Sequence, residues 1–229
     1  MFTGELIAIV TVLCWTVSVQ FFSSASKMIG AVPVNIFRIG IALLLFSLFL
    51  LLRDGSVVPS DVPIRGWLIL GLSGVVGLFF GDIFLFKAFV ELGPRIAMFI
   101  HSVAAPTTAV IGWLFLKEDY SAFQWLGICV TLIGVCLVIL EKREAITPAR
   151  NLGMRRVPLM GVIYGVLAML GQAVGYTLSK VGMQTEAGYL DAFGATEIRV
   201  IAAFTCFLVY FTATGTWHNV RRGLGNKRA

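Results

Sequence analysis

The sequence predicts an all-α protein, a polytopic bundle of transmembrane helices, and three observations support this fold class. Of the 229 residues, 58% are hydrophobic and 13% are charged, against about 45 to 50% and about 25% in an ordinary soluble domain. The apolar residues are grouped in runs of about 20 residues, the length with which a helix crosses a hydrocarbon core about 30 Å thick. Glycine, proline and charged residues separate the runs. Lipid is therefore the solvent that we expect for most of the chain.

Seven runs are long and apolar enough to span a membrane. Pro33 opens the second run, residues 93–95 separate the third from the fourth, and residues 117–121 separate the fourth from the fifth. The first run has no basic segment before it and no cleavage site of small residues, so we expect it to remain as a span. The runs lie near residues 5–23, 33–52, 66–90, 96–116, 121–140, 160–183 and 190–214.

Three pairs of glycines are spaced four residues apart inside these runs. This spacing lets the backbones of neighbouring helices approach closely, and it favours packing within one bundle over a dedicated dimer face. The pairs are Gly77 with Gly81, Gly161 with Gly165, and Gly171 with Gly175.

Residues 141–159 form the longest polar stretch inside the chain and mark the predicted linker between two repeats. After the linker the pattern begins again, because residues 196–203 of the seventh run parallel residues 35–42 of the second. Five spans bring the chain to the opposite face of the membrane, so a second copy must be inverted. We predict a five-helix repeat at residues 1–140, and the first two helices of an inverted second repeat with a basic tail at residues 160–229.

Six residues of the first repeat stand in the order and spacing of a known family. They are Trp15 in the first run, Arg38 early in the second, Pro106 within the fourth, Glu118 after it, and Gly127 and Gly134 in the fifth. Together they resemble the EamA-like family of the drug/metabolite transporter superfamily. The resemblance implies ten helices in two inverted halves around a central cavity. It also implies structural roles for Pro106, Glu118, Gly127 and Gly134.

The function that the resemblance implies is secondary-active export or exchange of small metabolites or drugs, by alternating access between the two halves. The chain departs from the family pattern because three helices of the second half are missing and Lys117 precedes Glu118 where the family often has glycine. It is then a fragment, a natural truncation, or a half-complete unit that needs another copy in a homo-oligomer. The alternative function is a non-transporting membrane fragment that acts as an assembly or regulatory partner.

Several other classes of protein are disfavoured. The chain has no HExxH zinc motif, no GxSxG elbow and no pair of deep aspartates, so we do not expect an enzyme. Its four cysteines lie inside apolar runs without CxxC spacing, and neither a metal nor a cofactor is expected. The net charge of +6 is concentrated in short polar stretches, which favours lipid headgroups over nucleic acid. The expected partners are a small-molecule substrate and the lipid bilayer.

Asp82 is the strongest candidate for a functional carboxylate because apolar turns flank it deep inside the third run. It is either a protonatable or substrate-binding group that faces a cavity, or half of a structural ion pair. Lys87 lies about 140° around the same helix, so the two residues do not share a face. We expect Lys87 to extend toward the interface, with Glu91 one turn later as its local partner.

Arg38 and Arg199 each lie a short way into a span, where a guanidinium can hold an anionic substrate group or brace facing helices. Glu197 does not share a face with Arg199 and is left for another partner. His101 lies near the start of the fourth span, and its pKa would permit proton coupling. An interhelical hydrogen bond is the more common role for a lone histidine of this kind, and we favour it.

Four residues of the first and sixth spans, Trp15, Gln172, Tyr176 and Lys180, can line a cavity for an apolar or cationic solute. Ordinary helix packing with an interfacial Lys180 accounts for them equally well. Glu118 follows the fourth span at a short turn, where we expect it to anchor the connection between helices.

The expected location is an integral position in the cell (inner) membrane of a bacterium or archaeon. The orientation is predicted in two opposite ways. Most basic residues lie on the face opposite the N-terminus, which by the positive-inside rule places the N-terminus outside. The family resemblance implies a cytoplasmic N-terminus.

Overall fold

The computed structural model describes residues 3–59, 62–145, 158–185, 188–218 and 220–221, and these residues form an α-helical bundle with one short two-stranded hairpin. Its elements are α1 Thr3–Ile29, α2 Ala31–Asp54, α3 Ile64–Ser73, the π-helix η1 Gly74–Gly81, α4 Asp82–Ser102, α5 Ala104–Leu116, α6 Ala122–Ala145, α7 Leu159–Met183, β1 Gln184–Thr185, β2 Gly188–Tyr189 and α8 Ala192–Thr214.

Each of the seven predicted spans is mostly helical, and two of them, residues 66–90 and 96–116, cross from one helical element into the next. Among the described residues, five helical segments are long and apolar enough to cross a membrane, and α6 contains a shorter apolar stretch, Ala122–Gly134. The segment Ile64–Leu116 has 53 residues, about 80 Å of helix at 1.5 Å per residue, which is far longer than a bilayer core. It reverses at Gly93, whose φ of 78° is a left-handed conformation that glycine adopts readily. This segment therefore contains two of the predicted spans.

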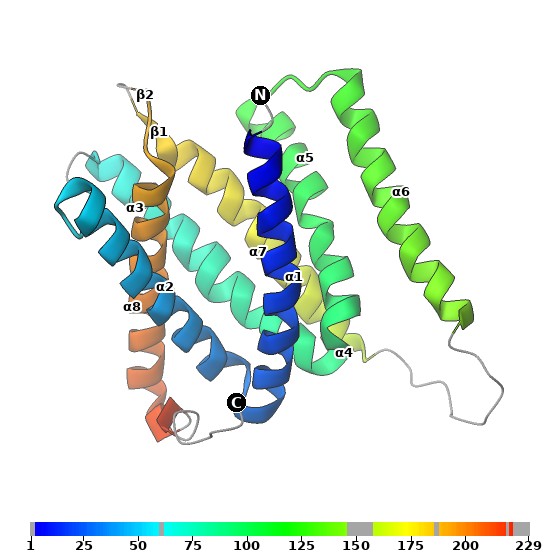
Figure 1. Cartoon of the computed structure of the whole chain (residues 1–229), viewed down its shortest axis with the longest axis horizontal. Helices are drawn as coiled ribbons and strands as arrows, with labels where there is room; N and C mark the ends of the chain where they lie inside the picture. The colour runs from blue at the N-terminus through cyan, green and yellow to red at the C-terminus, as the bar shows by residue number, and fades with distance from the viewer. Residues whose placement is uncertain (1–2, 60–61, 146–157, 186–187, 219, 222–229) are drawn as a thin grey trace.

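The helices run alternately between two ends of the bundle, which we name from Figure 1. The upper end holds the start of α1 and the end of α2, and the lower end holds the turn between α1 and α2. The long rod formed by α3, η1 and the first part of α4 crosses the bundle and packs against α7 (Figure 1). On one side α2 packs against α8, with the two helices antiparallel.

The direction of the helices agrees with an inverted second repeat. Helix α1 descends in Figure 1 whereas α7 ascends, and α2 ascends whereas α8 descends. These are the directions that the sequence predicts for a second copy of the first two helices. The division into repeats stays a prediction.

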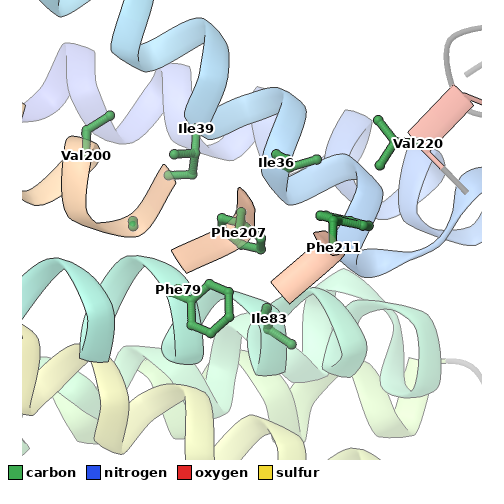
Figure 2. Close-up of a cluster of buried hydrophobic side chains, with 9 residues drawn as sticks. Ile36, Ile39, Phe79, Ile83, Val200, Phe207, Phe211 and Val220 are labelled. Carbon is green, nitrogen blue, oxygen red and sulfur yellow. The ribbon is translucent and has the colours of Figure 1, made fainter. Parts of the chain in front are cut away.

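A cluster of buried aromatic and branched side chains joins α2, η1, α4 and α8 (Figure 2). Phe79 of η1 packs edge-on against Phe207 of α8, with ring centroids 4.7 Å apart. Ile36 and Ile39 of α2 complete the cluster from the other side. Offset and edge-on aromatic pairs add about 0.5 to 1.5 kcal/mol beyond the area that they bury.

Glycines bring η1 and α7 into backbone contact, as the spacing in the sequence predicts. A Cβ added at Gly171 would lie 2.9 Å from Cα of Gly81, and one added at Gly175 would lie 2.9 Å from Cα of Gly77. Side chains larger than hydrogen at Gly171 and Gly175 therefore require the helices to separate.

A similar contact joins η1 to α8. A Cβ at Gly74 would collide with the backbone carbonyl of Arg199. The π-helix is thus held between α7 and α8 by glycines at three of its eight positions, Gly74, Gly77 and Gly81. Regular helix was expected here, and the π-helix was not predicted.

Helix α6 stands apart from the bundle in Figure 1 and is joined to it at its upper end by the turn after α5. At that end Trp125 contacts the rings of Trp113 and Tyr120, with centroids 6.2 and 5.9 Å away. No atom lies within 4 Å of a Cβ added at Gly127 or Gly134. These two glycines therefore make no close backbone contact with the described residues, and the structural role that the family resemblance implies for them stays a prediction.

Candidate functional site

Asp82 lies at the junction of η1 and α4, where it is 1% exposed. Arg38 of α2 donates from Nη2 to its Oδ2 and forms an ion pair. Gln172 of α7 donates from Nε2 to Oδ1 of Asp82 over 2.8 Å, and its Nε2 also lies 3.3 Å from the carbonyl oxygen of Gly77. Both carboxylate oxygens of Asp82 are thus bonded to residues of other helices. Asp82 was predicted to be either a protonatable or substrate-binding group, or half of a structural ion pair. The contact with Arg38 is such an ion pair.

Two aromatic rings lie close to the Arg38 guanidinium. Its central carbon lies 5.4 Å from the ring centroid of Phe86 and 6.0 Å from that of Phe22. A cation over an aromatic face is attracted by the ring quadrupole, and the attraction is stronger where water is excluded. The predicted bracing role of Arg38 is thus visible as a contact between α1, α2 and α4.

Arg199 of α8 also lies close to Gln172 and η1. Its guanidinium carbon lies 5.9 Å from the ring centroid of Tyr176. A Cβ added at Gly77 would lie 3.6 Å from Nη2 of Arg199 and 3.9 Å from Oε1 of Gln172, so both groups flank η1. Nε and Nη2 of Arg199 are buried and have no hydrogen-bond partner among the described residues.

We call Arg38, Asp82, Gln172, Tyr176 and Arg199 the polar cluster. Its formal charges are two guanidinium groups and one carboxylate, so it carries one net positive charge when all three are ionised. A charge held away from water is costly unless it is paired and hydrogen-bonded. The cluster therefore combines a satisfied ion pair with a guanidinium that has no counter-ion among the described side chains.

Two buried polar residues lie near the cluster's helices and were not predicted as site residues. Glu197 is fully buried and accepts a 2.5 Å hydrogen bond from Ser47 at Oε1, which is the other partner expected for it. Asn35 is also fully buried, and neither atom of its amide has a partner among the described residues. The sequence feature that could have identified Asn35 is its polar amide, which lies in an apolar run three residues before Arg38.

His101 does not form the interhelical hydrogen bond that was expected. It lies at the end of α4, and its Nδ1 is buried without a partner among the described residues. The break between α4 and α5 follows His101, and an interhelical role for this histidine stays a prediction.

Lys87 was predicted to extend toward the membrane interface and to pair with Glu91. It lines the cavity at the lower end of the bundle, but its contacts are with other residues. Its ammonium lies over the rings of Tyr164 and Phe84, 5.4 and 5.7 Å from their centroids. Glu91 is not among the ion-pair partners that the described residues form within 4.0 Å. The expected pair of Lys87 with Glu91 is thus replaced by contacts with aromatic rings of α4 and α7.

Glu118 anchors the turn after α5, as expected, and its partner is Lys180. Lys180 of α7 donates to Oε1 over 2.8 Å, and Tyr120 donates to Oε2 over 2.5 Å. These donors hold the pKa of the Glu118 carboxyl below its ordinary value, with the Lys180 hydrogen bond the larger cause. The contact joins the α5–α6 turn to the upper end of α7.

Trp15, Gln172, Tyr176 and Lys180 do not meet at one cavity. Trp15 packs against an apolar cluster of α1 and α4, whereas Lys180 is bound to Glu118. Only Gln172 and Tyr176 belong to the polar cluster. The four residues are thus not gathered at one place, since Trp15 and Lys180 have partners elsewhere in the described part of the chain, and cavity lining by Gln172 and Tyr176 stays a prediction.

Two cavities among the described helices lie away from the polar cluster. One of about 450 Å³ lies between α5 and α6, with Pro106 of the first turn of α5 and Gly127 in its lining. The other, of about 520 Å³, lies at the lower end and includes Lys87 and Glu91. Volumes of this size suit small molecules. No group of three or more candidate metal ligands occurs among the described residues.

Five apolar helical segments of spanning length, which enclose a buried ion pair, define an integral membrane protein. The model of the EamA-like transporter family matches residues 2–140. The chain belongs to the EamA-like transporter family. Its members are membrane-embedded transporters of small molecules, not enzymes.

A more distant similarity links the chain to a fungal protein. Over 112 residues it is 26% identical to the Uncharacterized membrane protein YMR253C of Saccharomyces cerevisiae. The matched part covers 47% of this chain and 26% of the yeast protein. The chain thus matches about a quarter of that relative's length, and the similarity supports membrane residence.

Proposed function

We propose that the chain is a secondary-active exporter of small solutes that works by alternating access, with the polar cluster as its coupling site. The observation that carries the proposal is the position of Asp82, whose carboxylate binds Arg38 of α2 and Gln172 of α7. One titratable group thus connects three helices, at the end of a π-helix. π-Helical turns occur frequently at functional sites.

Protonation of Asp82 would change the interactions that its carboxyl group makes with Arg38 and Gln172. The charged carboxylate holds the Arg38 guanidinium, whereas the neutral acid keeps a hydrogen bond to Gln172 but loses the ion pair. Arg38 would then be a second unpaired guanidinium beside Arg199, and like charges in a medium of low dielectric repel strongly. Separation of α2, which carries Arg38, from α8, which carries Arg199, relieves that repulsion, and this supplies a physical link between proton binding and movement of helices.

A second candidate function is a membrane protein that assembles with or regulates another one and transports nothing itself. The position of α6 favours it, because its apolar side chains Phe123, Leu126 and Val130 are 57 to 85% exposed. Lipid contacts such side chains equally well.

Reconstitution of the full chain into sealed liposomes tests both candidates. We expect at least one solute of a broad panel to move faster than in protein-free liposomes, and to respond to a pH gradient. Asp82→Asn should abolish the response to the gradient at equal expression, because the amide cannot titrate. Asp119→Asn is the matched control, since Asp119 is an exposed residue of the turn after α5.

The outcomes separate the proposals. Transport that stays pH-dependent in Asp82→Asn would rule out Asp82 as the coupling group. If the wild-type chain moves no solute of the panel, the transport proposal fails and the assembly function is favoured.

A further inference from the structure

The cavity of about 520 Å³ at the lower end is separate from the polar cluster. It lies where α1 ends and α2 begins, and α4, α7 and the end of α8 close its other sides. Its lining includes Ser26, the first turn of α2, Lys87, Glu91 and Tyr164. Three independent hydrogen-bond donors converge on it.

The first donor is the start of α2. Ala31 and Val32 begin this 24-residue helix and line the cavity, and no side chain caps this helix end. Their N–H groups have no intrahelical acceptor, and the helix dipole gives this end a partial positive charge. Pro33 follows without an N–H of its own. The N-terminus of a helix in this state favours an anion.

The second donor is the hydroxyl of Ser26. Thr11, Thr16 and Ser18 of α1 each donate to the carbonyl four residues earlier, which satisfies their hydroxyl groups within the helix. The Ser26 side chain does not follow this pattern: the residue is 2% exposed, and Oγ has no partner among the described residues. A buried hydroxyl without a partner lowers stability, so a group in the cavity that accepts a hydrogen bond from it would be stabilising.

The third donor is the ammonium of Lys87. It rests over the rings of Tyr164 and Phe84, and no described carboxylate lies within 4.0 Å of it. The rings hold the ammonium in place but supply no formal negative charge. Glu91 also lines the cavity and presents an acceptor to a donor group elsewhere on the same ligand.

We propose that this cavity binds an oxyanion, a phosphate or carboxylate group, through Lys87, Ser26 and the first turn of α2. The binding site is independent of transport and of Asp82. The oxyanion belongs either to a soluble anion or to the headgroup of a phospholipid, because the cavity lies at the end of the spans, where headgroups are found.

Inorganic phosphate and an anionic phospholipid are the two probes. In one arm, the purified full chain in a neutral detergent is titrated with phosphate at constant ionic strength, and the midpoint of thermal unfolding is followed. In the other arm, the chain is taken from vesicles of equal parts phosphatidylglycerol and phosphatidylcholine, and the retained lipid is measured by native mass spectrometry. The variants are Lys87→Gln and Ser26→Ala. Lys27→Gln is the matched control, since Lys27 is exposed at the same helix end and does not line the cavity.

We expect binding in the wild type and in Lys27→Gln, and a loss of about tenfold or more in affinity in Lys87→Gln, because hydrogen bonds to charged groups contribute about 1.5 to 3 kcal/mol. Ser26→Ala should weaken binding without lowering the unfolding midpoint of the ligand-free chain. If phosphate binds and the binding depends on Lys87, a soluble anion is sufficient to occupy the cavity. If phosphatidylglycerol is retained but phosphate does not bind, the ligand is the lipid headgroup.

Equal weakening by Lys27→Gln and Lys87→Gln would overturn the proposal, because it would indicate general surface attraction. Absence of binding of both probes to the wild type would also overturn it. Transport activity does not enter either arm, so failure of this proposal is distinguishable from failure of the proposed function.

Discussion

The glycines between η1 and α7 and the glycines of α6 have different surroundings, although both sets have helical spacing within apolar sequence. At the first, backbone meets backbone, and Cβ atoms at Gly171 and Gly175 would lie 2.9 Å from the facing glycines. In α6, Gly127 and Gly134 have no atom within 4 Å of an added Cβ. Glycine spacing in the sequence therefore indicates where close packing is possible, and the facing element decides whether it occurs.

The difference extends to how polar groups are held. In the centre, Asp82 is enclosed between α2 and α7 and bonded at both oxygens. At the start of α6, the ion pair of Glu118 with Lys180 lies near the surface, with Lys180 half exposed. The central contacts should therefore respond strongly to substitution, and those beside α6 weakly.

The largest effect is expected for Gly74→Ala. Because the new Cβ would collide with the backbone carbonyl of Arg199, η1 and α8 must move apart. Overpacking of this kind costs about 1 to 3 kcal/mol or more, and the rigid backbone places this site at the upper end. Thermal unfolding in detergent measures the loss. Gly71→Ala, one turn earlier in α3, is the control, because its Cβ would have its nearest neighbour 3.8 Å away. Equal midpoints for the two variants would contradict the backbone contact.

Gly175→Ala should be the next most disruptive. Its Cβ would lie 2.9 Å from Cα of Gly77, and separation of α7 from η1 should lower stability by about 1 to 3 kcal/mol. The same exchange at Gly134 of α6 should leave the unfolding midpoint unchanged or raise it slightly. A loss at Gly134 as large as that at Gly175 would mean that α6 packs as tightly as the centre, which would remove the contrast.

Ser47→Ala should have a moderate effect, because it removes the hydrogen bond to Oε1 of the fully buried Glu197. Oε2 of Glu197 already lacks a partner among the described residues. We expect a loss of about 1 kcal/mol in the free energy of unfolding. Thr205→Ala is the control, since its hydroxyl bonds only the carbonyl of Ile201 in its own helix. No difference between the two variants would mean that Ser47 contributes nothing to the burial of Glu197.

The smallest effect is expected for Glu118→Gln, below about 1 kcal/mol, because solvent screens an ion pair whose lysine is half exposed. Its sign depends on pH. The pKa of Glu118 is lowered in the folded chain, so its contribution is present above the ordinary value of about 4.3 and is lost as the pH falls through the lowered pKa. Unfolding midpoints of wild type and variant should differ at neutral pH and converge in acid. A difference that grows on acidification would exclude this linkage.

Several features were accessible from the sequence because they depend on local order along the chain. Asp82 was identified by its depth in an apolar run, and the 140° between Asp82 and Lys87 correctly excluded a pair between them. The pairs Gly77 with Gly81 and Gly171 with Gly175 indicated close packing. Helix periodicity and the free energy of burying charge in lipid decide these points without knowledge of any partner.

Other features depended on how helices cross. The partner of Asp82 lies 44 residues away at Arg38, and that of Glu118 lies on α7 at Lys180. The hydroxyl of Ser26, which has no hydrogen-bond partner among the described residues, was missed because a serine in a helix usually donates to the backbone of its own helix. The π-helix was missed because its wider turn, over only eight residues, produces no recognisable period in the sequence. Its three glycines were a signal.

The sequence by itself determined that this chain lies in a membrane, where its spans are, and to which family it is similar, because composition and apolar length act locally and add along the chain. Only the tertiary structure decided which glycines pack, which guanidinium is paired and where donors converge on a cavity. These properties require atoms from different helices to meet within a few ångströms, and the crossing of the helices sets that distance.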